Sequence, residues 1–150
     1  MDRFVAVRER FVVVPAVHVL LVRGERVLLA RRHNTGYEDG KWSVPAGHLD
    51  GDESVRAAAV REAEEEVGIQ LSTERVRFGH VMHRRKPDEE RVDFFVVSEQ
   101  WGGEAHIAEP NKCSELMWAN PQALPSDTIP YVRRGIELTF RREPYSEFGW

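Results

Sequence analysis

The chain has 150 residues and a single cysteine, Cys113, which excludes an intrachain disulfide and makes a reducing cytoplasm the expected location. Its net charge of −4 argues against a nucleic acid duplex or an acidic membrane as a partner. The apolar run 11–22 has only about 12 residues, too few to span a bilayer, and the charged start MDRFVAVRERF is unlike a signal peptide. Length and a hydrophobic content of 41% predict one globular domain over residues 1–150.

Extended segments dominate the first third of the chain. Residues 11–22, FVVVPAVHVLLV, are rich in β-branched side chains and predict a buried strand, in which Pro15 indicates a bend or an edge position. The following residues predict a turn at 23–26, a returning strand at 27–32, a polar loop at 33–40 and a short extended segment at 42–47.

A helix is predicted for residues 53–67. Asp52 is a suitable N-cap, and Glu53 would place a negative charge in the first turn, where the helix dipole favours it. Alanines and valines fill the interior, and Gly68 is placed to terminate the helix.

The second half of the chain mixes strands with one more helix. We expect strands at 75–83 and 91–98 joined by a charged loop at 84–90, a short strand at 115–119, a helix at 129–142 and an irregular tail. This mixture predicts an α/β or α+β sandwich.

Three glutamates in the predicted helix share one face. At about 100° per residue, Glu62, Glu65 and Glu66 fall within an arc of about 100°, whereas Glu64 points away. They repel one another and stand near the helix C-terminus, where the dipole disfavours anions. A bound cation would remove this cost, and hard oxygen ligands favour Mg²⁺, with Mn²⁺ as the other candidate.

These glutamates belong to a longer motif. Residues 47–69, GHLDGDESVRAAAVREAEEEVGI, resemble the signature of the Nudix hydrolases. The resemblance implies a Nudix fold, a mixed central β-sheet sandwiched between helices, over roughly residues 10–142. It also implies metal-dependent hydrolysis of a diphosphate linkage in a nucleotide, and it assigns roles to residues of the motif. The implied catalytic and metal-binding residues are Glu62, Glu65 and Glu66, with the Gly47 carbonyl as a further ligand; Gly47, Glu53, Arg61 and Gly68 are the implied structural residues.

A second segment bears on the substrate. Glu109–Cys113, EPNKC, followed by Trp118 and Leu124-Pro125, resembles the MutT-homologue members, which cleave nucleoside triphosphates to a monophosphate and pyrophosphate. The candidate substrate-binding residues are Arg31 and Arg32 for phosphate, Trp42 for stacking on a nucleobase, and Glu109 within this segment.

The sequence leaves alternatives open. The ADP-ribose type of Nudix enzyme carries a proline 15–17 residues beyond the signature, and Pro87 lies 18 residues beyond Ile69, so ADP-ribose or a related derivative is the second substrate class. A non-catalytic nucleotide sensor is the third hypothesis, although such domains usually lack the metal-binding glutamates. The general base is also open: it is the first glutamate of the run, Glu62, in the MutT type, and a later loop residue in other members. Base, sugar, number of metals and assembly are not specified; family members are often homodimers.

Overall fold

The computed structural model describes residues 9–150 and contains one mixed β-sheet with a helix on each face, as the sequence predicted. Its strands are β1 (Val14–Arg23), β2 (Arg26–Arg32), β3 (Trp42–Ser43), β4 (Ala46–His48), β5 (Arg77–Lys86), β6 (Glu89–Ser98), β7 (Cys113–Ala119) and β8 (Tyr145–Phe148). The order across the sheet is β3-β2-β1-β6-β5-β8, with β4 paired to β1 and β7 paired to β2.

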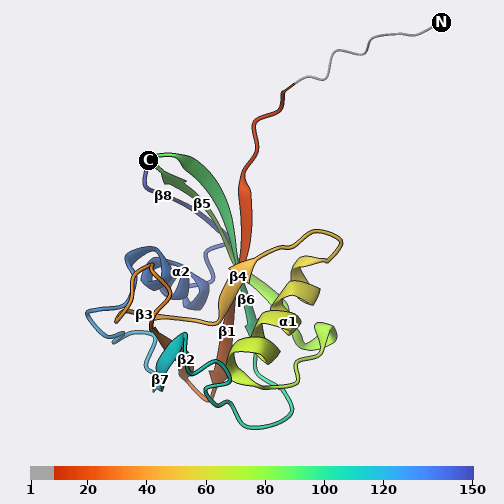
Figure 1. Cartoon of the computed structure of the whole chain (residues 1–150), viewed down its shortest axis with the longest axis vertical. Coiled ribbons are helices and arrows are strands. Elements are labelled where there is room, and N and C mark those ends of the chain that lie inside the picture. Colours follow the sequence, from red (N-terminus) through yellow and green to blue (C-terminus); the bar gives the residue numbers. More distant parts are fainter. Residues whose placement is uncertain (1–8) are drawn as a thin grey trace, which may run out of the picture.

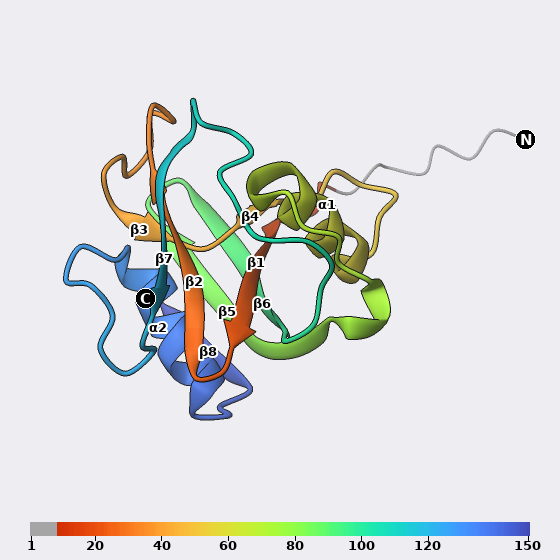
Figure 2. The same cartoon turned by 90° about the horizontal axis from the view of Figure 1, so that it is seen from below.

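Two α-helices cover the sheet. Helix α1 (Val55–Val67) lies on one side and α2 (Pro130–Phe140) on the other, as Figures 1 and 2 show from two directions. A short 3-10 helix, η1 (Thr73–Arg75), leads from α1 into β5. Within residues 9–150, no helix is long and apolar enough to cross a membrane.

Strand β1 divides the interior into two cores, because successive side chains of a strand point to opposite faces. Val17, Val19 and Leu21 pack with Ala59 and Ala63 of α1. Leu20 and Val22 belong to the other core, which includes residues of α2. Each face of the sheet is therefore closed by one amphipathic helix, and β1 contributes to both.

Pro15 does not mark an edge strand. It pairs in register with Val92 of β6, and β1 also pairs with β4, so the expected edge position was wrong. As the second residue of β1, Pro15 still offers its carbonyl, which accepts a hydrogen bond from the Leu49 N–H at 3.2 Å. A proline is tolerated near the start of a strand because only one ladder donor is lost there.

Helix α1 begins two residues later than the sequence suggested. Its N-cap is Ser54, whose side chain accepts from the Ala57 N–H, and not Asp52, which has a φ of 53° and belongs to the preceding turn. Glu53 therefore precedes the helix. Gly68 does cap the other end, with a φ of 67° that glycine adopts readily.

Two further segments differ from the expectation. The stretch predicted as a charged loop, 84–90, forms the ends of β5 and β6, which pair as far as Lys86↔Glu89. Arg84 and Asp93 lie diagonally across this hairpin, with Arg84 Nε 2.7 Å from Asp93 Oδ2, and this ion pair compensates two buried charges within the strands. The tail is not irregular, because Tyr145–Phe148 adds as β8 to the free edge of β5.

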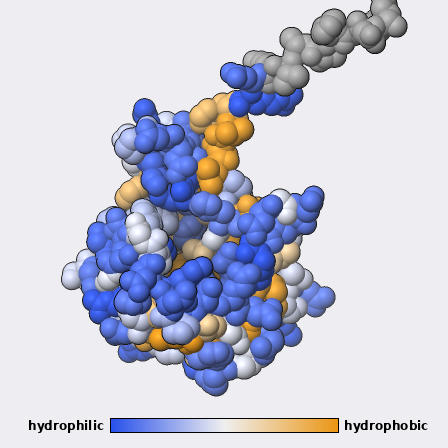
Figure 3. All heavy atoms as spheres, in the orientation of Figure 1, coloured by the Kyte–Doolittle hydropathy of each residue, from blue (hydrophilic) through white to orange (hydrophobic). Residues whose placement is uncertain are grey.

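The face of the molecule drawn in Figure 3 is mainly hydrophilic. The apolar stretch just before β1 is an exception, with Phe11 exposed by 73% and Val12 by 76%. Figure 1 shows that this segment extends away from the sheet and the helices.

Candidate active site

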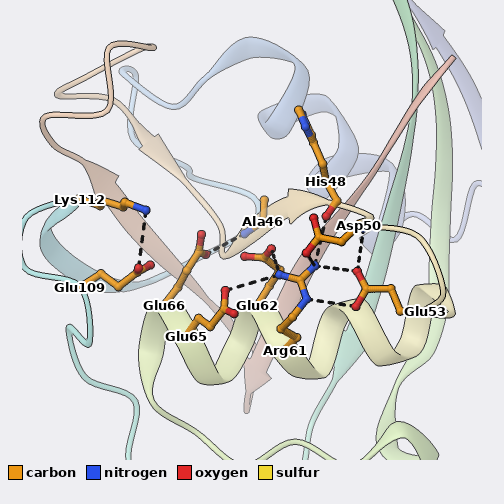
Figure 4. Close-up of polar contacts among 10 residues, drawn as sticks. All are labelled: Ala46, His48, Asp50, Glu53, Arg61, Glu62, Glu65, Glu66, Glu109 and Lys112. Carbon is orange, nitrogen blue, oxygen red and sulfur yellow. Dashed lines mark hydrogen bonds and ion pairs between the residues drawn. The ribbon is translucent and has the colours of Figure 1, made fainter.

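Helix α1 directs three carboxylates toward β4, as Figure 4 shows. Glu62 is 8% exposed, Glu66 is half-buried and Glu65 is exposed. Glu64 is also exposed, and it forms no ion pair among the described residues. The helix thus brings Glu62, Glu65 and Glu66 to one side, and the β4 backbone lies over them.

Arg61 connects α1 to the loop that precedes it. Its Nη2 donates to Glu53 Oε1 at 2.7 Å and to the His48 carbonyl at 3.2 Å, and its Nε donates to Glu53 Oε2 at 3.1 Å. Its Nη1 lies 2.7 Å from Glu62 Oε1 and 3.5 Å from Glu65 Oε2. Hydrogen bonds from Arg61 and from the Asp50 N–H lower the pKa of Glu53 to about 2. This network sets the position of Glu62 relative to β4.

Gly47 lies where a side chain would not fit. A Cβ atom at this position would overlap the carboxylate of Glu62, so only glycine lets that carboxylate rest against β4. The neighbouring Ala46 N–H donates to Glu66 Oε2 at 2.9 Å. Two carboxylates of α1 are therefore packed directly against the backbone of β4.

The pKa of Glu66 is raised to about 8. Burial is the main cause and repulsion from Glu62 is the second, while the Ala46 N–H opposes them; burial also raises the pKa of Glu62. These carboxylates carry more negative charge than their immediate surroundings compensate. A cation at this site would stabilise their ionised forms.

The donor chemistry fits a divalent metal ion. All the available ligands are hard oxygens, the class that Mg²⁺ and Mn²⁺ prefer. Between residues 9 and 150, however, no three His, Cys, Asp or Glu side chains already converge as a metal site. Glu62 is hydrogen-bonded to Arg61 and Glu66 to Ala46 instead. The assignment of Glu62, Glu65, Glu66 and the Gly47 carbonyl as ligands therefore stays a prediction.

The two neighbouring arginines of β2 have different surroundings. Arg31 donates to the Gly40 carbonyl, and it pairs with Glu115 at 3.0 Å and with Asp127 at 3.6 Å. Arg32 donates to the Tyr37 carbonyl and the Thr35 hydroxyl, and has no carboxylate at ion-pair distance within the described part of the chain. Its charge acts on Glu66, whose pKa it lowers slightly. Arg32 is thus the better-placed of the two to meet an anionic ligand.

Arg32 borders two cavities. The smaller, of about 40 Å³, also touches Glu66, Glu109 and Cys113. The larger has a volume of about 400 Å³ and lies beside β4; its lining includes His18, Tyr37, Gly47, Lys86, Arg91 and Tyr131. We call this second space the larger cavity. Sequence reasoning missed His18, Tyr37 and Tyr131, although a histidine that interrupts an apolar strand was a usable signal.

Trp42 and Glu109, the remaining substrate candidates, lie in different settings. Trp42 is 6% exposed and belongs to the core beneath α2, with the Arg31 guanidinium 5.5 Å from its ring centre. Glu109 begins a turn in which its carbonyl accepts from the Lys112 and Cys113 N–H groups. Its carboxylate is 3.7 Å from Lys112 Nζ and contributes to raising the pKa of Glu66.

Comparison with known proteins identifies the family. The NUDIX domain model matches residues 12–139. The chain is 29% identical over 118 residues to the putative 8-oxo-dGTP diphosphatase of Bacillus subtilis, an alignment that covers 79% of this chain and 73% of that protein. It is also 29% identical over 149 aligned residues to the RNA pyrophosphohydrolase of Novosphingobium aromaticivorans, covering 80% of this chain and 85% of that one.

A solved structure agrees with these sequence matches. The MutT NUDIX hydrolase from Burkholderia pseudomallei superimposes with a TM-score of 0.75 and 29% identity, covering 83% of this chain and 96% of that one. Nudix hydrolases generally use divalent metal ions, in keeping with the oxygen ligands on α1. Since the family model spans well over half of the sequence, the chain belongs to the NUDIX domain family and is a Nudix hydrolase.

Proposed function

We propose that the chain hydrolyses nucleoside or deoxynucleoside triphosphates to the monophosphate and pyrophosphate, with Mg²⁺ as its metal ion. The observation that carries this proposal is the position of Arg32, which lines both the smaller cavity beside Glu66 and the larger cavity. A triphosphate and its nucleoside need adjoining sites of these two kinds. The 8-oxo-dGTP diphosphatase among the relatives and the EPNKC segment support the same substrate class.

The chemical problem is the attack of water on a phosphorus atom shielded by negative oxygens. A bound divalent ion supplies neutralisation of phosphate charge and a lower pKa for coordinated water. In our assignment, Glu62, Glu65, Glu66 and the Gly47 carbonyl hold that ion. Glu62 is the general base, because Arg61 fixes its carboxylate against β4. Water adds to phosphorus, the bond between the α and β phosphates breaks, and pyrophosphate leaves.

Arg32 has the phosphate-binding role in this proposal. No carboxylate lies within ion-pair distance of Arg32 in the part of the chain that the structure describes, whereas Arg31 is already engaged with Glu115 and Asp127. A guanidinium can bind two phosphate oxygens at once. The proposal therefore predicts that Arg32→Ala raises KM for triphosphates more than Arg31→Ala does.

A substrate panel with Mg²⁺ tests the proposed function. We expect monophosphate and pyrophosphate from triphosphates, and little or no cleavage of ADP-ribose. Glu66→Gln should reduce kcat/KM by several orders of magnitude, whereas Glu64→Gln, a change on the opposite side of α1, should leave it nearly unchanged. Cleavage of ADP-ribose alone would replace this substrate class with the second one. Equal activity of Glu66→Gln and the wild type would overturn the metal assignment.

A further inference from the structure

A histidine and a tyrosine meet at the wall of the larger cavity. His18 of β1 is 1% exposed, and its Nε2 lies 3.1 Å from the hydroxyl of Tyr131 on α2. The imidazole is stacked on Phe95, with ring centres 4.7 Å apart, and meets the Tyr131 ring edge-on. Both residues line the larger cavity that also touches Gly47. The pair is therefore part of the cavity wall.

The tyrosine ring is held from below by a buried charge. Arg84 donates two hydrogen bonds to Asp93, from Nε at 2.7 Å and from Nη2 at 3.3 Å. Its guanidinium carbon lies 3.6 Å from the centre of the Tyr131 ring, a close cation–π contact. Arg84 is 4% exposed and Asp93 is 0% exposed, so the group that supports the Tyr131 ring is buried.

The surroundings of His18 determine which ring nitrogen carries its proton. Asp93 Oδ1 is 4.0 Å from Nε2, so its negative charge favours an N–H there over a lone pair. Nδ1 is buried and makes no hydrogen bond of regular geometry, although the Phe94 backbone lies close enough to the ring to raise the pKa of His18. The proximity of Asp93 to Nε2 therefore carries the assignment of the lone pair to Nδ1. Nε2 is thus the donor, and the Tyr131 oxygen is the acceptor.

This direction fixes the tyrosine proton as well. A phenolic proton stays near the plane of the ring, so it can point in one of two directions from the oxygen. The hydrogen bond from His18 occupies one of these directions, which leaves the other for the tyrosine proton. Tyr131 forms no other hydrogen bond among residues 9–150. Burial raises its pKa to about 12, so the hydroxyl is protonated at neutral pH. The cavity wall consequently presents an oriented hydroxyl donor.

We infer that Tyr131, positioned by His18, makes the cavity select nucleobases that present a carbonyl oxygen to this hydroxyl over bases that present an amino group. The inference rests on the proposed function, since it names the substrates which that site prefers. A carbonyl accepts the hydroxyl proton, whereas an amino group would set one donor against another. A donor that loses its acceptor when a substrate binds is costly, so we expect a discrimination of about tenfold or more in kcat/KM.

Two substrate pairs that differ in one exocyclic group, and in the proton on the adjacent ring nitrogen, test this inference. ITP and ATP differ in a carbonyl or an amino group at C6, and UTP and CTP differ in the same way at C4. We expect the wild-type enzyme to favour ITP over ATP and UTP over CTP by about tenfold or more in kcat/KM. Tyr131→Phe keeps the ring on Arg84 and removes only the hydroxyl. It should lower kcat/KM for ITP and UTP by about tenfold and leave ATP and CTP within about twofold.

Tyr145→Phe is the matched control. Tyr145 lies on β8 and does not line the larger cavity, and its hydroxyl donates to Glu147 Oε2 at 3.0 Å, so its loss should not change the ratio between the members of a pair. Nitrogen-15 shifts of the His18 ring give a readout independent of turnover, and they should show the Nε2–H tautomer. The Nδ1–H tautomer, or equal losses on all four substrates in Tyr131→Phe, would overturn the inference. Failure to cleave any triphosphate would instead overturn the proposed function.

Discussion

Arg61 and Glu53 form a bidentate ion pair, with Arg61 Nη2 2.7 Å from Glu53 Oε1 and Arg61 Nε 3.1 Å from Glu53 Oε2. The pair joins the body of α1 to the residue just before its N-cap, and it closes the loop that follows β4. Because Arg61 also reaches Glu62, its contact with Glu53 also positions a carboxylate of the candidate site (Figure 4). The pair therefore contributes by holding the Glu62 carboxylate in position.

Arg61→Lys should therefore lower activity more than stability. Lysine keeps the charge but cannot hold Glu53 with two parallel bonds while also contacting Glu62. We expect kcat/KM to fall about 100-fold from misplacement of the site carboxylates. Arg56→Lys is the control, since Arg56 lies on the same helix and donates to the Val76 carbonyl, away from the glutamates. Equal losses in the two variants would show that the effect is one of helix stability.

Gly47→Ala should give a folded protein with impaired catalysis. The new methyl group would meet the end of the Glu62 side chain, which can rotate away at little cost to folding. The carboxylate then leaves its place against β4, and we expect kcat/KM to fall at least about tenfold while the melting temperature changes little. Gly102→Ala serves as the comparison, because its Cβ would make an ordinary contact with Gln70 Oε1 at 3.4 Å. Full activity in Gly47→Ala would contradict the placement of Glu62.

Gly135→Ala should destabilise the fold, although alanine is the better helix former. In an exposed helix the change would gain about 1 kcal/mol. Here the methyl group would overlap the ring of Phe95, which is fully buried under α2, so we expect a net loss of about 1–3 kcal/mol. Urea denaturation measures it, with Arg134→Ala, an exposed neighbour in α2, as the reference. A stabilised Gly135→Ala protein would mean that the ring moves freely.

Stability should decline as the pH falls from 6.5 toward 4, because of His18. Burial is the main cause that lowers the pKa of His18 from 6.5 to about 4. Between these two pH values His18 is protonated in the unfolded chain but not in the folded protein. The contribution is fully present above pH 6.5 and disappears as the pH approaches 4; it amounts to about 3 kcal/mol at most.

Urea denaturation of the wild type and of His18→Phe across this range isolates the effect. Phenylalanine keeps the stacking on Phe95 and cannot bind a proton, so the variant should show the shallower pH dependence. Glu66, whose pKa is raised, gives a slope of opposite sign in both proteins and cancels in the difference. Identical slopes would show that His18 binds its proton equally well in the folded and unfolded states.

The sequence predicted the elements that local pattern determines. Apolar and β-branched runs indicated β1 and β2, alanine content and a terminating glycine indicated α1, and apolar spacing indicated α2. The spacing of Glu62, Glu65 and Glu66 put them on one side of α1. It failed where distant segments decide the structure. Asp52 was the natural N-cap on local grounds, but the contact of Glu53 with Arg61 draws the chain into a turn there, and Ser54 takes that role.

The cavity wall could not be predicted in the same way. His18 lies in an apolar strand and Tyr131 at the start of α2, and only the folded sheet brings their polar atoms together. Arg84 looked like part of a solvated loop because its partner, Asp93, lies across a hairpin whose tight turn was not recognised. Local sequence carries no information about such pairings, which depend on strand register.

Val17 and His18 are consecutive residues of β1, yet the first faces the core under α1 and the second the opposite face. In our assignment, the residues for bond cleavage lie on the α1 side of β1, and the residues for substrate selection lie on its other side. Natural variation can exchange the groups around His18 and Tyr131 and leave the carboxylates intact. A directed-evolution library confined to His18, Tyr37 and Tyr131 would explore new nucleotide preferences with the hydrolytic apparatus inherited unchanged.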